Sequence, residues 1–276
     1  MTDDIVFATA FADGPGGGNP CPIVFGADGW PTERMRALAE KLGHETAFVL
    51  PPRDGGDVRL RYFVPLHEME MCVHATVATV VHLAGTGRLT GNPAAVETPL
   101  GVRAVTWDAG SAMVEQFPPV FGPEVDPAPV LAALRIAEAT GPIRSVSTAR
   151  AKLMVPVADE DTLDAIEPDH ELLWDVCDRL DVTGFYPYAV DERIAARQFP
   201  RRAGYPEDPA TGVAACALGA HLAVGDPTPG WHRYTVHQGR AMGRPSLMIA
   251  ESLVGPGGTV TATRVGGRSV TTSGSP

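Results

Sequence analysis

The chain has 276 residues, of which 44% are hydrophobic, and carries a formal net charge of −11. This composition favours a folded core, and the excess of acidic residues excludes nucleic acid and an anionic membrane surface as expected partners. The sequence holds no run of about eighteen apolar residues, and its first residues lack the basic flank and apolar stretch of a signal peptide. We therefore expect a cytoplasmic protein of one large or two small domains.

Helical and alternating patterns divide the chain into elements. Apolar periodicity predicts helices over residues 32–42, with Thr32 as the cap, over 129–139, and over 161–180 with a break at Pro168. Two further helices, rich in small residues, are expected to begin near Val73 and Gly212. Strands are predicted by alternation of apolar and polar residues, at 58–65, 102–107 and 233–237 among others. Residues 117–129 contain five prolines and are the expected linker between two halves.

The four cysteines lie far apart, without a CxxC pair or a Cys/His spacing typical of zinc ligands. They are Cys21, Cys72, Cys177 and Cys216. The sequence therefore predicts no metal site and no disulfide framework, and buried thiols are the simplest interpretation.

An internal repeat relates the two halves. The tripeptide His-Leu-Ala at residues 82–84 recurs at 221–223, an offset of 139 (221 − 82). An Arg-x-Phe segment, at 61–63 and again at 197–199, leads through a turn to the small-residue helix in both halves. The repeat indicates a duplicated unit of strands followed by one buried helix, related by a pseudo-twofold axis. The other pairs at the same offset are Glu68 and Glu207, Ala75 and Ala214, and Ala78 and Ala217.

A duplicated unit can bring two helix N-termini together at the seam between the lobes. Their unpaired N–H groups and positive dipole ends would suit a small carboxylate. The two helix starts, near residues 72–76 and 208–213, would each contribute a titratable side chain, His74 and Asp208. A purely structural role for Asp208, as an N-cap followed by Pro209 in the first turn, remains an open alternative.

Five segments resemble the PhzF-like phenazine-biosynthesis isomerase family, which has the diaminopimelate-epimerase-like fold. No single segment is decisive, but the set is specific because the segments span nearly the whole chain in the family's order. They are GNPCPIVF (18–25), ETAFV (45–49), RYFVPLHEMEMCVHAT (61–76), RQFPRRAGYPEDPATG (197–212) and QGRAMGRPS (238–246).

The resemblance implies an α+β fold of two pseudo-symmetric lobes, each a curved, mostly antiparallel sheet wrapped around a central helix. The N-terminal lobe, residues 1–118, would carry Glu45 and His74, and the C-terminal lobe, residues 119–276, would carry Asp208. The active site would lie in the cleft between them. Family members work without a metal or an organic cofactor and are commonly homodimers, so we expect no cofactor, a homodimer and a small carboxylic-acid substrate.

The resemblance also assigns roles to individual residues. The family's acid/base glutamate falls on Glu45, its histidine on His74 and its aspartate on Asp208. Backbone amides at the helix starts would hold the substrate carboxylate, and two polar side chains match positions near the cleft. These binding residues are Val73, Gly212 and Val213 for the amides, and Asn19 and Gln238 for the side chains.

Proton transfer by Glu45 is chemically coherent. Moving a double bond by a 1,3-proton shift needs one group that removes a proton from carbon and returns it two atoms away, and one carboxylate can do both. Glu45 precedes the apolar residues 47–49, and apolar surroundings raise the pKa of a carboxyl group toward the working range of an acid or base. Without the resemblance, a surface glutamate at a strand end would be the simpler interpretation.

Two departures from the family's pattern concern the expected carboxylate site. The family's usual Cys-Gly-His is Cys-Val-His here, with Val73 in place of glycine, and its usual Gly-Ser is Gly-Val, with Val213 in place of serine. Both changes add apolar bulk, and the second removes a hydroxyl donor. We therefore expect a substrate other than the dihydro-hydroxyanthranilate of phenazine biosynthesis. A conjugated acid of another antibiotic or secondary pathway, such as an alkylproline precursor, is the expected alternative.

Two other functions compete with this interpretation. An epimerase or racemase of the same fold would need a second thiol at residue 211 (72 + 139), where the chain has Thr211, and Cys216 lies more than a helical turn further on. A small-carboxylate binding protein without turnover is also consistent with the fold. The presence of Glu45, His74 and Asp208 together disfavours it.

Overall fold

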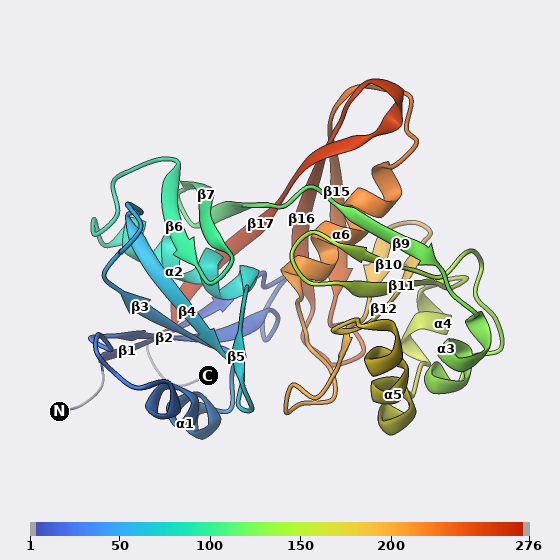
Figure 1. The fold of residues 1–276 in the computed structure, drawn as a ribbon, viewed down its shortest axis with the longest axis horizontal. Helices are drawn as coiled ribbons and strands as arrows, with labels where there is room; N and C mark the ends of the chain where they lie inside the picture. The colour runs from blue at the N-terminus through green and yellow to red at the C-terminus, as the bar shows by residue number, and fades with distance from the viewer. Residues whose placement is uncertain (1–3, 273–276) are drawn as a thin grey trace.

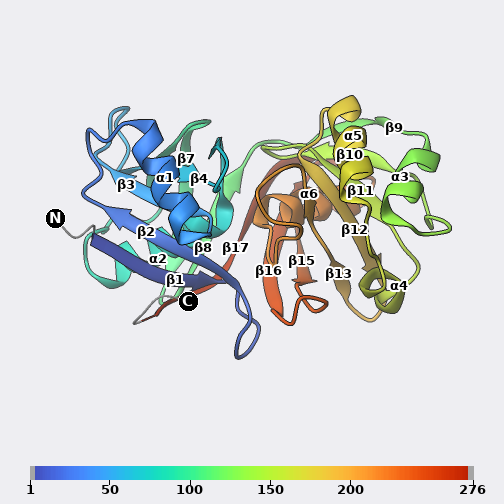
Figure 2. The same cartoon turned by 90° about the horizontal axis from the view of Figure 1, so that it is seen from below.

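Two lobes lie side by side in the computed structural model, which describes residues 4–272 (Figure 1). Each lobe is a curved, mostly antiparallel sheet wrapped around one central helix, which confirms the predicted α+β architecture. Figure 2 shows the same arrangement from below, with α2 inside the N-terminal lobe and α6 inside the C-terminal lobe. None of the helices within residues 4–272 is both long and apolar enough to cross a lipid bilayer.

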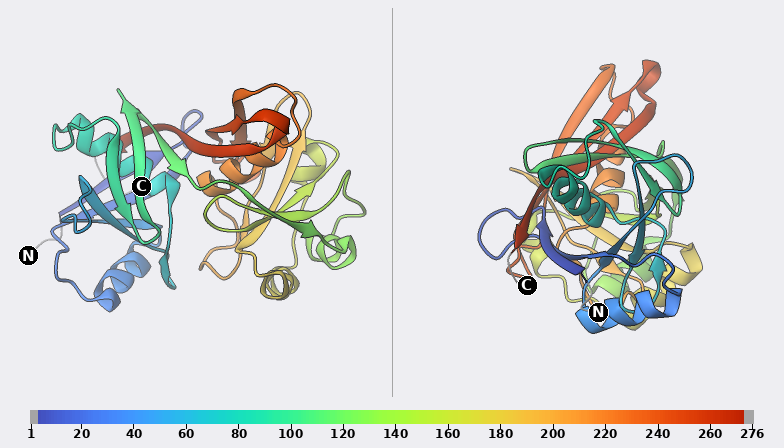
Figure 3. Two further views of the ribbon diagram at one scale, coloured as in Figure 1. Left: turned by 45° about the horizontal axis from the view of Figure 1, so that its top comes forward. Right: turned by 90° about the vertical axis from the view of Figure 1, so that its left-hand side faces the viewer.

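The N-terminal lobe is closed by a strand from the other end of the chain. Its sheet runs in the order β1–β2–β3–β4–β6–β7–β8, and β17 (Val260–Thr272) pairs with both β1 and β8. Figure 3 shows β17, in red, running from the C-terminal lobe to the N-terminal lobe. The remaining elements are β1 (Asp4–Ala10), β2 (Asn19–Phe25), α1 (Thr32–Leu42), β3 (Thr46–Leu50), β4 (Val58–Phe63), β5 (Glu68–Met69), α2 (Val73–Gly85), β6 (Ala94–Thr98), β7 (Gly101–Asp108) and β8 (Ser111–Gln116).

The C-terminal lobe repeats this plan, with its sheet in the order β9–β10–β11–β12–β13–β15–β16–β17. Helices α3, α4 and α5 cover the outer face of this sheet and enclose a second apolar core. The elements are β9 (Val120–Glu124), α3 (Pro127–Leu134), β10 (Arg144–Ser147), β11 (Lys152–Pro156), α4 (Glu160–Asp164), α5 (His170–Leu180), β12 (Gly184–Val190), β13 (Ile194–Ala196), β14 (Phe199–Pro200), α6 (Gly212–Ala223), β15 (Gly230–Gln238), β16 (Ser246–Val254) and the short 3-10 helix η1 (Pro256–Gly258).

The duplication predicted from the sequence is confirmed by the strand pairings. The order β1–β2–β3–β4–β6–β7–β8 recurs as β10–β11–β12–β13–β15–β16–β17, and the parallel pairs fall at matching places: β2–β3 with β11–β12, and β4–β6 with β13–β15. Helix α6 begins 139 residues after α2 (212 − 73). The repeat also preserves an ion pair, since Arg61 binds Glu68 at 2.6 Å and Arg197 binds Glu207 at 2.8 Å.

The two central helices differ from the surface helices in their sequence pattern. Both α2 and α6 consist largely of apolar and small residues, and most of their side chains are buried within the lobes. A helix that is apolar all round must be enclosed on every side, and each sheet wraps around one. By contrast, α1 has an exposed face that carries the Arg36–Glu40 ion pair.

Most predicted elements are present, and three details differ. Of residues 117–129, the expected linker, only 117–119 connect β8 in the first lobe to β9 in the second. The rest form β9 and the first turn of α3, because Pro123 lies in an edge strand and Pro127 begins a helix, positions that tolerate proline. Helix α3 therefore begins and ends earlier than the predicted helix at 129–139. Thr32 does not cap α1: the N-cap is Pro31, and the Thr32 hydroxyl accepts a bond from Arg61. The predicted lobe boundary at residue 118 stays a prediction. The sequence did not indicate that β17, from the C-terminal end of the chain, pairs with strands of the first lobe.

Candidate active site

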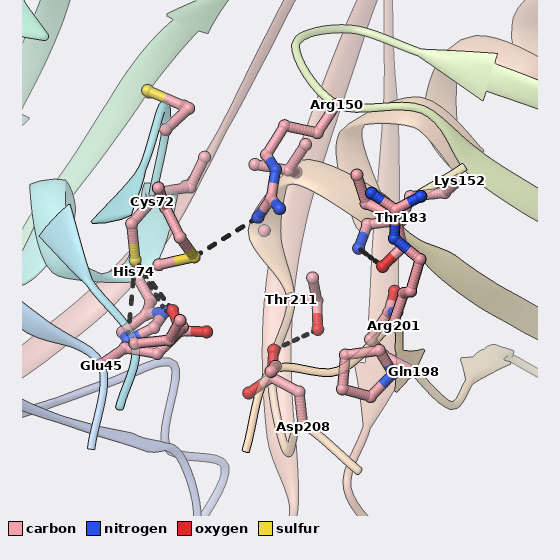
Figure 4. Close-up of a pocket in the computed structure, with 18 of the residues that line it drawn as sticks. Glu45, Cys72, His74, Arg150, Lys152, Thr183, Gln198, Arg201, Asp208 and Thr211 are labelled. Carbon is pink, nitrogen blue, oxygen red and sulfur yellow. Dashed lines mark hydrogen bonds and ion pairs between the residues drawn. The ribbon is translucent and has the colours of Figure 1, made fainter. Parts of the chain in front are cut away.

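A cleft lies between the lobes, at the N-terminal ends of α2 and α6 (Figure 4). The two helix ends touch: a Cβ atom on Gly212 would lie 2.6 Å from Cγ1 of Val73, so only glycine permits this approach. The first N–H groups of both helices, which have no partner within the helix, therefore lie at one place. The expected meeting of the helix starts is confirmed.

Glu45 lies in the short connection between α1 and β3 and borders the cleft. Its Oε1 accepts a hydrogen bond from the hydroxyl of Tyr205 in the other lobe, and its Oε2 accepts one from the Cys72 thiol at 3.1 Å. His74 Nδ1 lies 3.5 Å from the same Oε2. The side chain is only 12% exposed, which excludes the interpretation of Glu45 as a surface residue.

The electrostatic state of Glu45 differs from the expectation. Burial raises its pKa, as predicted, but the neighbouring His74 and the hydrogen bonds from Tyr205 and Cys72 outweigh burial and lower the pKa below its usual value. His74 is itself buried, and burial lowers its pKa despite the opposing effect of Glu45. At neutral pH the site therefore holds an ionised Glu45 beside a neutral imidazole.

Asp208 approaches the cleft from the loop before α6. Its Oδ1 accepts a bond from Asn19 Nδ2 at 2.7 Å, and its Oδ2 contacts the Thr211 hydroxyl. Burial first, and then repulsion from Glu45, raise the pKa of Asp208 to about 8. The N-cap of α6 is Thr211, so the interpretation of Asp208 as the cap of this helix is wrong, and its catalytic role stays a prediction.

The other predicted binding residues divide into two groups. Val73, Gly212 and Val213 border the cleft, and the two valines add apolar bulk beside the helix ends. Asn19 and Gln238 lie behind Asp208 and do not border the cleft. Asn19 Nδ2 also lies 3.5 Å from His74 Nδ1, and Gln238 Nε2 donates to the Asp208 carbonyl at 2.6 Å. These two amides are placed to position the catalytic candidates.

The two helix N-caps occupy matching positions in the lobes, as the offset of 139 requires: Cys72 precedes α2 and Thr211 precedes α6. Burial, then the charge of Glu45, raise the pKa of the Cys72 thiol well above its usual value. A protonated thiol facing a threonine does not provide the pair of thiolate bases that a two-cysteine epimerase needs.

Glu45, Cys72 and His74 also have the spacing of a possible metal-ion site, since the atoms that could bind a metal all lie within 4.8 Å of one another. The hydrogen bonds among the three side chains account for the cluster, and the raised pKa of Cys72 opposes the thiolate that a metal would require. The prediction of a site without metal stays a prediction.

Several residues that border the cleft were not anticipated from the sequence. Tyr205 was missed although it lies in a segment that resembles the family. Arg150, Lys152 and Arg201 bring positive charge to the C-terminal side of the cleft, and Gln198 lies beside them (Figure 4). A lysine at the start of the otherwise apolar strand KLMVP was the one available signal for this group.

The comparisons with known proteins agree in family and in fold. The sequence model of the family described as "Phenazine biosynthesis-like protein" (PhzC-PhzF) matches residues 8–274. The chain is 34% identical to the uncharacterized isomerase YddE of Escherichia coli strain K12, covering 90% of this chain and 89% of that protein. It is 32% identical to the trans-2,3-dihydro-3-hydroxyanthranilate isomerase of Pseudomonas fluorescens, covering 96% of each. The crystal structure of a Bacillus anthracis phenazine biosynthesis protein of the PhzF family superposes with a TM-score of 0.86 and 28% identity, covering 97% of this chain and 96% of that one. This chain belongs to the PhzF-like, phenazine-biosynthesis-like family.

Proposed function

We propose that this protein is a cofactor-independent isomerase that moves a double bond by a 1,3-proton shift in a small unsaturated carboxylic acid of secondary metabolism. One observation carries the proposal: Glu45 and Asp208 border the same buried cleft, and their pKa values are displaced in opposite directions. A carboxylate and a carboxylic acid held together at neutral pH are the usual basis for assigning a base and an acid.

In the proposed reaction, the backbone amides of Val73, Gly212 and Val213 bind the substrate carboxylate. Glu45 removes a proton from one carbon, the electron pair moves through the conjugated system, and Glu45 returns the proton two atoms away. No electrons are gained or lost overall. Protonated Asp208 donates a hydrogen bond to the polarised conjugated system, and neutral His74 fixes the position of the Glu45 carboxylate.

The names of the relatives support an isomerase, and the site supports a substrate different from theirs. Val73 and Val213 narrow the end of the cleft at which the carboxylate would bind. We therefore propose a conjugated acid other than dihydro-hydroxyanthranilate, such as an alkylproline precursor used in antibiotic biosynthesis. The homodimer and the cytoplasmic location remain predictions from the sequence.

The two competing functions are less well supported. An epimerase lacks its second thiol, because Thr211 faces the cleft where a cysteine would be required. A binding protein without turnover has no need for two carboxyl groups of opposite protonation state in one cleft.

The proposal is tested by proton NMR in deuterated water, with a panel of conjugated unsaturated carboxylic acids. We expect at least one acid to gain deuterium at a carbon two atoms from the site of proton loss, with displacement of the double bond. Exchange at a single stereogenic carbon with inversion would instead identify an epimerase. Saturable binding of a panel member without deuterium incorporation would identify a binding protein.

A further inference from the structure

One side of the cleft carries positive charge that the proposed proton shift does not use. Three residues of the C-terminal lobe border the cleft and are here called the basic cluster: Arg150, Lys152 and Arg201. In Figure 4, Lys152 and Arg201 lie across the cleft from Glu45, Cys72 and His74, and Arg150 lies between the two groups, above Asp208. The chain has a net charge of −11, so a concentration of cations inside this cleft is a local feature that calls for a counter-charge.

Lys152 forms no ion pair in the described part of the chain. Lys152 is only 4% exposed, and its ammonium group donates one long hydrogen bond, of 3.5 Å, to the Thr183 carbonyl. Within residues 4–272 it forms no ion pair with a carboxylate, although the charges of Asp208 and Glu45 raise its pKa. Burial, and then the nearby Arg150, lower the pKa of Lys152 to about 7. A buried ammonium is costly unless it is paired, so an anionic partner in the cleft would complete this environment.

Gln198 gives a second, independent indication. It is 1% exposed and borders the cleft, yet neither its Oε1 nor its Nε2 has a hydrogen-bond partner among the described residues. The amide is confined by Gly184, where a Cβ atom would lie 2.4 Å from Gln198 Nε2. Buried side-chain amides are rarely left unbonded, so this one points to a ligand group.

The two arginines are only loosely engaged within the protein. Arg150 Nε lies 3.4 Å from a Glu70 oxygen without forming a hydrogen bond, and its NH1 donates to Met69 Sδ at 3.3 Å. Arg201 NH1 donates one long bond, of 3.4 Å, to Asp178 Oδ1. A guanidinium group has five N–H donors, so both arginines retain donors for a bound oxyanion.

We propose that the basic cluster and the Gln198 amide bind a second oxyanionic group of the substrate, a carboxylate or a phosphate, distant from the reacting carbons. The substrate is then a dianion, with one carboxylate at the helix ends and the second anion at the basic cluster. The inference extends the proposed function, on which it rests only for the position of the first carboxylate.

Isothermal titration calorimetry on the unmodified protein tests this with unreactive probes. The probes are the saturated dicarboxylates from succinate to suberate, their monomethyl esters, and the corresponding ω-phosphonocarboxylates. We expect at least one dianion to bind about tenfold or more tightly than its monoester. Tighter binding of the dicarboxylate or of the phosphonate distinguishes the two kinds of oxyanion.

Variants locate the effect. Arg201→Gln and Lys152→Met should each remove most of the preference for the dianion, by about tenfold. Arg202→Gln is the matched control, because Arg202 is the adjacent arginine, pairs with Asp178 at 2.6 Å and does not border the cleft, and it should preserve the preference. Arg201 is a third exposed, so its variant tests the proposal even if Lys152→Met fails to fold.

Equal affinity for dianions and monoesters would overturn the proposal. If both kinds of probe also weakened in Arg201→Gln, the basic cluster would hold the substrate's only carboxylate. These measurements require no turnover, so they are independent of the deuterium-exchange test. A protein that prefers dianions but exchanges no deuterium would retain this inference and lose the proposed isomerase activity.

Discussion

Replacing Glu45 by glutamine removes the proposed base and preserves the size of the side chain. The carboxylate accepts bonds from Tyr205 and Cys72 on its two oxygens, with His74 beside one of them. An amide has one oxygen, so one of these donors would face an N–H group. Leaving a buried donor unsatisfied costs about 1–3 kcal/mol, and the loss of a buried charge offsets part of that cost. We therefore expect the Glu45→Gln variant to fold.

The catalytic loss should be much larger than the loss of stability. General acid/base groups contribute about 10²- to 10⁴-fold, which corresponds to about 2.7–5.4 kcal/mol of the activation barrier. The amides of Val73 and Gly212 are unchanged, so the affinity for a carboxylate ligand should change little. Turnover and deuterium exchange are followed by NMR with the panel member that the unmodified protein converts, and the dissociation constant by calorimetry.

The same variant has an electrostatic signature at a second residue. The charge of Glu45 helps to raise the pKa of Asp208, so its removal should lower the Asp208 pKa toward the usual range of aspartate. A carbon-13 NMR titration of the Asp208 carboxyl group measures this shift. Exchange of substrate deuterium at the parental rate in Glu45→Gln would refute the assignment and leave Asp208 as the base.

Four further predictions follow from the site. Cys72→Ser should retain most of its turnover, and chelators should have no effect; a folded Cys72→Ser protein that no longer exchanges protons would support a thiol mechanism. Changing Val73 to Gly together with Val213 to Ser should give some activity toward trans-2,3-dihydro-3-hydroxyanthranilate, and efficient turnover of that compound by the unmodified protein would contradict our interpretation of the valines. Asp208→Asn and His74→Ala should slow the reaction and weaken ligand binding more than Glu45→Gln does, because both residues lie at the helix starts that would hold the carboxylate; unchanged ligand affinity in both variants, measured by calorimetry, would contradict this. Activity should fall as the pH rises through about 8, because Asp208 must be protonated. The pKa of Asp208 in the folded protein lies above its unfolded value of 3.8. The contribution of Asp208 to the free energy of unfolding is therefore complete below pH 3.8 and is lost as the pH rises to about 8. Denaturant titrations of Asp208→Asn should not show this loss of stability between pH 3.8 and about 8.

The sequence was sufficient for those features that repeat or depend on local pattern. The offset of 139 residues located both central helices, since α2 and α6 are both rich in small and apolar residues and are preceded by matching strands. The linker was predicted too long, because proline content alone does not distinguish a linker from an edge strand followed by a helix start; only residues 117–119 connect the lobes.

The electrostatics of the site could not be predicted in the same way. The pKa of Glu45 depends on Tyr205, which is 160 residues away in sequence and belongs to the other lobe. Its apolar neighbours in sequence gave the opposite direction. Lys152 and Gln198 were missed for a related reason. What marks them is that their buried polar groups have few or no bonding partners among the described residues, and only the folded structure shows this.

The return of β17 to the N-terminal lobe has a consequence for how the protein is made. The hydroxyl of Ser269 bonds to the carbonyl of Thr9, across 260 residues of chain, and β17 supplies the partner of both β1 and β8. During synthesis the first lobe therefore emerges with two unpaired sheet edges, at β1 and β8. Its sheet can close into a barrel only after β17, at the end of the second lobe, has been translated. Such edges are sites of aggregation, and contacts so distant in sequence slow folding. Deletion of residues 260–272 should accordingly damage the lobe that is translated first.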